Sequence, residues 1–190
     1  ALHTLDPSTL GLADEPVVGP GDEIERWCRL LQTVDPALAP GWPDVASALR
    51  DTEPASAPAA LVHGDFRLGN LLAEDAAVTA VVDWEIWTVG DPRVDVGWFA
   101  VNADPQTYQR ATRYEHGLPS PADLITAYTA ARGREVADLG WFEALACFKS
   151  TATWSLIVKH NRRRADPDPD VEAIAGVLPS LLARARDLMT

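Results

Sequence analysis

Residues 61–72 read LVHGDFRLGNLL, where two apolar runs flank a short polar stretch. This stretch places His63, Asp65, Arg67 and Asn70 within eight positions. Apolar runs that are separated by turn residues predict short strands joined by a tight loop. An imidazole, a carboxylate, a cation and an amide on one turn make this loop the first place to look for chemistry.

A second carboxylate follows the next apolar run, at Asp83. Asn and Asp side chains at the ends of adjacent strands offer hard oxygen ligands, which suit Mg²⁺ shared with phosphates. Asp65 is a third oxygen group nearby, able to accept a proton from a nucleophile or to orient it. Phosphoryl transfer needs this division of labour, because its loose transition state requires positioning and charge neutralisation.

The rest of the chain has helical patterns, so we expect one domain over 1–190, mainly α with a small β insert (α+β). Apolar spacing and helix start and stop signals support this fold class. The expected strands cover 59–63, 70–74 and 78–84. The expected helices cover 22–34, 43–51, 91–101, 120–133, 138–164 and 171–189, the last one bent near Pro179.

Composition excludes several classes of partner. The chain has 190 residues, 47% of them hydrophobic, with a formal charge of −12. That charge opposes binding to nucleic acid or to an anionic membrane surface. Two separated cysteines predict neither a disulfide framework nor a zinc site, and no apolar stretch reaches membrane-spanning length. We therefore expect a cytoplasmic protein.

Three segments resemble one family when taken together. HGDFRLGN fits H-G-D-x-x-x-x-N, and it is followed by VVDWE at 81–85 and GDPRVD at 90–95. In this order they are similar to the aminoglycoside phosphotransferase and choline kinase-like family, whose members are relatives of protein kinases. The resemblance implies the C-terminal lobe of a protein kinase-like fold, with residues 1–12 as its first helix. The N-terminal lobe that covers the nucleotide has no counterpart in the chain.

The resemblance implies roles for the loop residues. Asp65 would be the catalytic base that faces the acceptor hydroxyl. Asn70 and Asp83 would bind the Mg²⁺ that bridges the phosphates of ATP. Arg67 would neutralise charge on the transferring phosphoryl group, and Leu72 would form the floor under adenine.

Other residues are expected to have supporting or local roles. Asp95 would brace the catalytic loop by accepting hydrogen bonds from its backbone, and His63 would support the loop geometry. Glu85 stands where protein kinases have a glycine, and it either contacts metal-bound water or pairs with a neighbour. Asp91 is explained by helix capping alone. The remaining histidines are expected to be ordinary surface or helix-end residues: His3, His116 and His160.

The leading hypothesis is an ATP- and Mg²⁺-dependent kinase for a hydroxyl group of a small molecule. In it, this chain supplies the catalytic loop and the missing N-terminal lobe is a partner from the same protein, so the isolated chain is expected to be inactive. Two alternatives stay open. One is a catalytically silent fragment or interaction domain, and the other is a metal-dependent phosphohydrolase built on His63, Asp65 and Asp83.

Overall fold

The computed structural model of the chain describes residues 2–75, 77–108 and 119–190. Helices dominate; four of the described strands lie in the sequence between the second and third α-helices, and the first strand precedes the first α-helix. The helices are α1 (Pro20–Leu31), α2 (Trp42–Asp51), α3 (Arg93–Ala103), α4 (Pro121–Arg132), α5 (Leu139–Asn161), α6 (Pro169–Ile174) and α7 (Leu178–Asp187). The strands are β1 (Val17–Val18), β2 (Ala60–Val62), β3 (Leu71–Glu74), β4 (Ala77–Val81) and β5 (Thr88–Gly90). This confirms the expected mainly helical α+β domain.

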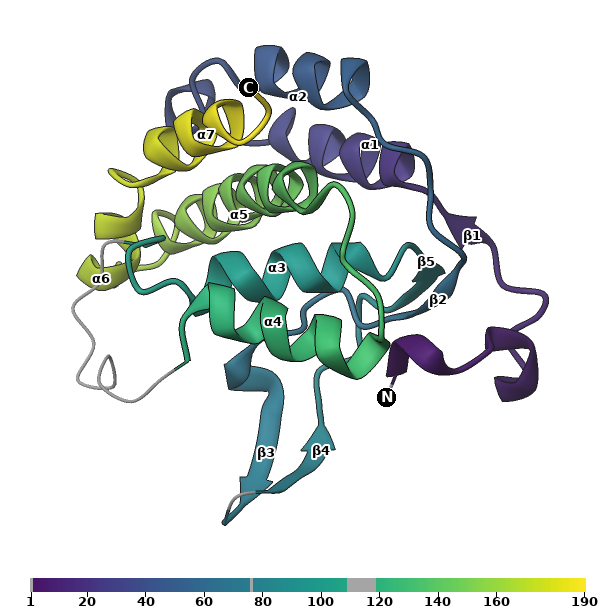
Figure 1. The fold of residues 1–190 in the computed structure, drawn as a ribbon. Coiled ribbons are helices and arrows are strands. Elements are labelled where there is room, and N and C mark those ends of the chain that lie inside the picture. Colours follow the sequence, from purple (N-terminus) through teal and green to yellow (C-terminus); the bar gives the residue numbers. More distant parts are fainter. Residues whose placement is uncertain (1, 76, 109–118) are drawn as a thin grey trace.

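Helix α5 lies at the centre of the molecule, with α1, α2 and α7 on one side and α3 and α4 on the other (Figure 1). Its residues are apolar on most of its circumference, and Phe142, Leu145 and Phe148 are each at most 2% exposed. A helix that is apolar all round must be covered by other elements on several sides. This explains why α5 carries the core and why the shorter helices pack around it.

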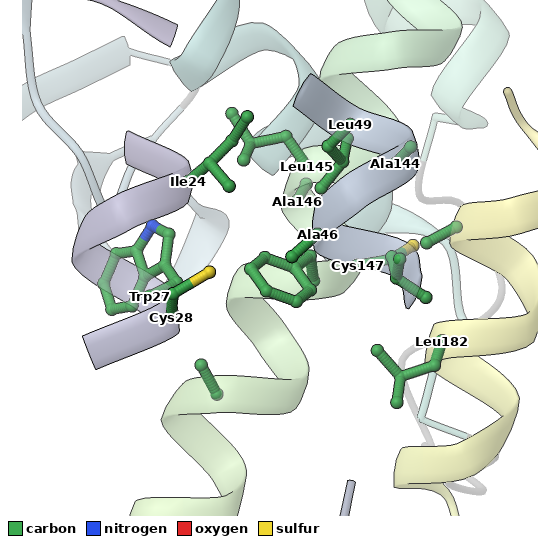
Figure 2. Packing of buried hydrophobic residues seen from close by; sticks show 14 of the residues in the cluster. Ile24, Trp27, Cys28, Ala46, Leu49, Ala144, Leu145, Ala146, Cys147 and Leu182 are labelled. Carbon is green, nitrogen blue, oxygen red and sulfur yellow. The ribbon is translucent and has the colours of Figure 1, made fainter. Parts of the chain in front are cut away.

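The core cluster joins α1, α2, α5 and α7 (Figure 2). Ile24 and Trp27 from α1 belong to one cluster with Leu49 from α2 and Ala146 from α5. Full burial of one Leu, Ile or Phe side chain contributes about 1.5–3 kcal/mol. The cluster therefore fixes α1 and α5 relative to each other, which matters because residues from both helices lie beneath the candidate loop at 63–70.

Helices α3 and α5 approach closely at Gly97. A Cβ built at this glycine would lie 2.5 Å from the backbone of Phe142 in α5. Only hydrogen fits at that distance, so the glycine is what allows α3 to lie against α5. As a result Asp95 and Trp98, on either side of Gly97 in the sequence, are held near the centre of the molecule.

The two sheets hold the candidate loop between them. In the first sheet the strand order is β1-β5-β2, with β1 parallel and β2 antiparallel to β5. In the second, β3 and β4 form an antiparallel hairpin that projects away from the helices (Figure 1). The segment from 63 to 70 connects β2 to β3, so it crosses from the first sheet to the second.

The structure confirms most of the expected helices and corrects three expectations. In place of the expected helix 1–12, the described residues 2–12 contain two 3₁₀ turns, Leu2–Thr4 and Pro7–Leu10, because Pro7 and the left-handed Gly11 interrupt a longer helix. The expected helix 171–189 is two helices, α6 and α7, and Pro179 lies in the first turn of α7, where a proline is tolerated. Strands β1 and β5 were not expected from the sequence, since each has at most three residues.

In the part of the chain that the structure describes, no helix combines the length and apolarity needed to cross a membrane.

Candidate active site

The carboxylate of Asp65 lies among three donors. Its Oδ1 accepts a hydrogen bond from Nε1 of Trp98 at 2.8 Å. Its Oδ2 accepts from Nε of Arg67 at 3.1 Å and from Nδ2 of Asn70 at 2.9 Å. An ionised carboxylate has about four lone-pair directions, so these donors orient Asp65 and leave it able to accept one more proton. The side chain is 20% exposed, which keeps that position within reach of solvent or an acceptor.

His63 is fully buried and both of its ring nitrogens are bonded to the backbone. The N–H of Asp65 donates to Nδ1 of His63 at 3.1 Å, so Nδ1 is unprotonated. Nε2 must then carry the proton, and it donates to the carbonyl of Val82 at 2.9 Å. The ring therefore links the loop to the residue before Asp83. A neutral ring with both nitrogens occupied can neither bind a metal nor act as a base, which removes a ligand that the phosphohydrolase hypothesis requires.

Asp95 binds the start of the loop from beneath. Its carboxylate accepts from the backbone N–H of His63 at 2.7 Å and of Gly64 at 2.8 Å, and it is 1% exposed. Gly64 has a φ of +83°, and a Cβ at this position would collide with the carbonyl of Ile86. A left-handed glycine is what lets two successive N–H groups point at one carboxylate. This geometry is compatible with the bracing role expected for Asp95.

Asn70 and Asp83 offer oxygen atoms that suit a divalent cation. Both acceptors of the Asn70 NH₂ group belong to Asp65, its backbone carbonyl at 2.8 Å and its Oδ2, so the amide oxygen lies on the side away from Asp65. Asp83 is exposed and has a left-handed backbone, with a φ of +69°. The N–H of Val82 donates to the carbonyl of Asn70 at 2.9 Å, which ties the two segments together.

The donor chemistry at Asn70 and Asp83 fits Mg²⁺ that is shared with a nucleotide. Within residues 2–75, 77–108 and 119–190, no three His, Cys, Asp or Glu side chains are gathered to hold a metal on their own. Two protein oxygens are nevertheless enough for Mg²⁺, which usually keeps several waters and takes further ligands from substrate phosphates.

The other predicted site residues lie around the loop. Arg67 is half exposed and pairs with Asp65. Leu72 lies in β3 and is 52% exposed, which makes it an uncovered apolar surface. Glu85 is exposed, and Asp91 is buried. Their assigned roles stay predictions.

Asp91 was expected to cap the helix, but the N-cap of α3 is Pro92, and Asp91 instead forms a buried ion pair and one hydrogen bond with the backbone at the start of α3. It accepts from the backbone N–H of Arg93 at 3.0 Å and pairs with the guanidinium of Arg93 at 2.7 Å. Burial acts to raise the pKa of Asp91, but hydrogen bonds from Arg93 and from the N–H of Ala57 outweigh burial and hold that pKa below its usual value. Arg93 also donates to the carbonyl of Ala55 at 2.6 Å. The pair therefore fastens the connector before β2 to the start of α3.

Sequence reasoning missed three residues of this region. Trp98 is bonded to Asp65, and Lys149 of α5 donates to the carbonyl of Gly64 from a buried position. His3 was expected to be an ordinary surface residue, but its ring lies 3.0 Å from Asp95 and 2.9 Å from the hydroxyl of Tyr128. Proximity of this kind arises from folding and leaves no local pattern. Only the charge of Lys149 within an apolar helix signalled an unusual position.

Of the other two histidines, His160 and His116, the structure describes one. His160 is exposed near the end of α5, as expected, and His116 lies outside the described residues.

Comparison with known families agrees with this geometry. The model of the phosphotransferase enzyme family matches residues 1–145, which is most of the chain. The chain therefore belongs to the phosphotransferase enzyme family, and the resemblance noted in the sequence is confirmed.

The curated relatives are longer proteins, and their names place them among acyl-CoA dehydrogenase family members. The chain is 31% identical over 162 residues to acyl-CoA dehydrogenase family member 11 of Rattus norvegicus, covering 78% of this chain and 21% of that protein. It is 36% identical over 98 residues to the protein of the same name from Homo sapiens, covering 47% of this chain and 13% of that protein. The chain thus spans about a fifth or less of the length of these relatives.

Two solved structures share the fold. A provisionally assigned aminoglycoside phosphotransferase from Ralstonia eutropha aligns with a TM-score of 0.75 at 23% identity, covering all of this chain and 61% of the other. A choline/ethanolamine kinase family protein from Mesorhizobium loti aligns with a TM-score of 0.56 at 22% identity, covering 88% of this chain and 52% of the other. These alignments confirm the protein kinase-like fold.

Proposed function

We propose that this chain supplies the catalytic loop of an ATP- and Mg²⁺-dependent kinase that phosphorylates a hydroxyl group of a small molecule. The observation that carries the proposal is the Asp65 carboxylate, which Trp98, Arg67 and Asn70 orient while leaving it partly exposed. A general base must be held in position with one lone pair free for the proton that it removes. Family membership supports the same class of reaction.

In the proposed reaction, Asp65 accepts the proton of the acceptor hydroxyl. The hydroxyl oxygen forms a bond to the γ-phosphorus while the bond from that phosphorus to the β–γ bridging oxygen breaks, and ADP leaves. Arg67 is half exposed, so its guanidinium can turn from Asp65 toward the transferring phosphoryl group. Asn70 and Asp83 would hold Mg²⁺, which neutralises phosphate charge when it is bound.

We further propose that a nucleotide-covering lobe outside this chain completes the site. The support is that the chain aligns with only 61% and 52% of the two solved structures. If the chain were a catalytically silent domain, the hydrogen bonds that orient the Asp65 carboxylate would serve no reaction. A cytoplasmic location is supported by two buried cysteines, Cys28 and Cys147, that are both free thiols.

The test replaces Asp65 with asparagine in the full-length protein. ADP formation is measured with a panel of acceptors: an aminoglycoside and choline, after the names of the solved structures, and an acyl-CoA, after the name of the curated relatives, in a form that carries the hydroxyl group that the proposed reaction needs. With the responsive acceptor, Asp65→Asn is expected to reduce kcat by about 10²–10⁴-fold, the contribution of a positioned general base. The control is Asp75→Asn, at an exposed turn between β3 and β4.

Two results would contradict the proposal. One is wild-type turnover by Asp65→Asn. The other is release of free phosphate without a phosphorylated acceptor, which indicates a hydrolase.

A further inference from the structure

Beneath the catalytic loop lies a buried ammonium group that the proposed mechanism does not use. Lys149 is on the central helix α5, and its side chain is among the buried charged groups, at 3% exposure. Its Nζ donates a hydrogen bond to the carbonyl of Gly64, the residue directly before Asp65. Burying a charge is strongly unfavourable unless the surroundings compensate. A lysine kept at this position therefore calls for a physical explanation.

Two tryptophan rings enclose the ammonium. Nζ lies 4.0 Å from the ring centroid of Trp98 and 5.3 Å from that of Trp27. The faces of indole rings attract cations, and the attraction is stronger in desolvated sites. Trp98 is also the donor to Oδ1 of Asp65. Lys149 thus reaches Asp65 in two ways, through the carbonyl of Gly64 and through the indole of Trp98.

The charged groups that face Lys149 come from three elements. Burial lowers the pKa of Lys149 to about 8. The carboxylates of Glu23 on α1, Asp65 on the loop and Asp95 on α3 act in the opposite direction, and Arg26 on α1 acts with burial. The side chain therefore carries its proton at neutral pH and loses it under mildly alkaline conditions.

We propose that Lys149 is a positioning residue for Asp65. Its ammonium holds the Gly64 carbonyl and the Trp98 indole in the arrangement that points the carboxylate at the acceptor hydroxyl. This inference rests on the proposed function. It adds a residue of α5 to the site, 85 positions from the loop residue that it contacts.

The first experiment compares pH profiles of kcat in the full-length protein. Wild-type kcat is expected to fall as pH rises from 7 to 9.5, with a midpoint near 8, because the ammonium is lost. Lys149→Met should lower kcat at pH 7 by about 10–100-fold, the cost of a misplaced catalytic group, with the KM for ATP unchanged. It should also abolish the alkaline fall.

Lys149→Arg provides the rescue, because a guanidinium remains protonated throughout this range. Its kcat should exceed that of Lys149→Met and should not fall between pH 7 and 9.5. The matched control is Lys159→Met, since Lys159 is the other lysine of the chain, on the same helix, and donates to the carbonyl of Thr33 at 2.5 Å. Wild-type kcat at pH 7 in Lys149→Met, or an alkaline fall that is the same in both, would overturn the proposal.

A second measurement needs no turnover. Lysine labelled at Cε and Nζ gives an NMR titration, in which the Lys149 signal is assigned by its loss in Lys149→Met. Replacing Asp65 with asparagine removes one carboxylate that faces the ammonium, so the pKa of Lys149 should fall while the titration of Lys159 stays in place. An unchanged Lys149 titration would refute the coupling.

The two measurements separate this inference from the proposed function. If Asp65→Asn keeps its turnover, the proposed function fails whatever the NMR titration shows. If Asp65→Asn loses turnover while the Lys149 titration and the Lys149→Met profile match wild type, only the positioning role fails.

Discussion

Replacing Asp95 with alanine should lower the free energy of unfolding of the domain, and the hydrogen bonds of Asp95 give the size of this loss. The carboxylate accepts from two buried backbone N–H groups, those of His63 and Gly64, and pairs with the ring of His3. Each buried N–H left without an acceptor costs about 1–3 kcal/mol, so the two together cost about 2–6 kcal/mol. Water that enters the vacated space can satisfy part of this loss. We therefore expect a loss of about 3 kcal/mol in the free energy of unfolding.

Urea unfolding followed by circular dichroism measures this loss. With an m-value of about 2–3 kcal/mol per molar, the midpoint should fall by about 1–1.5 M urea while m stays constant. Asp95→Asn should fall between wild type and alanine, because one acceptor oxygen is kept and an NH₂ group now faces a backbone donor. The control is Asp14→Ala at an exposed position, which should change the midpoint little.

A midpoint for Asp95→Ala equal to that of Asp14→Ala would refute this reasoning. It would mean that the two N–H groups are satisfied equally well without the carboxylate. The bracing role of Asp95 would then have no energetic basis.

Two further outcomes follow from close packing and from charge. Gly97→Ala should lower the free energy of unfolding by about 1–3 kcal/mol, because the added Cβ would lie 2.5 Å from the α5 backbone. Gly176→Ala is the control, since its added Cβ would have its nearest contact at 3.6 Å and should cost little. Equal urea midpoints for the two variants would contradict this prediction. Asp91 has a lowered pKa in the folded state, so its pairing with Arg93 stabilises the fold above the unfolded pKa of about 3.9 and is lost as pH falls through the folded value. The stability difference between wild type and Asp91→Asn should therefore be constant from pH 5 to 7 and shrink below about pH 4, and a difference independent of pH down to 2 would contradict it.

The long helices could be predicted because their signals are local. Ser120 caps α4 at the expected position, and the left-handed Gly133 ends it. The predictions that were wrong or missing concern segments whose local signals are short or conflicting. Strands of two or three residues exist only because a distant strand pairs with them, as β1 does with β5. The break between α6 and α7 likewise lies before Pro179, not at it.

By itself, the sequence determined the chemistry available on the loop. The spacing of Asp65, Asn70 and Asp83 within one short segment placed a proposed base and two proposed oxygen ligands together, because the strands on either side of them are neighbours in the chain. The family assignment followed from the same residues and was confirmed by comparison.

Only the tertiary structure decided how Asp65 is held. Trp98 comes from α3 and Lys149 from α5, and they are separated from the residues that they contact by 33 and 85 positions. No local pattern encodes such contacts, because they arise when the glycine at 97 lets α3 lie against α5 and the core fixes α1 beside them. That packing places a buried lysine beneath the loop, and it orients the carboxylate of Asp65 within an otherwise ordinary polar turn.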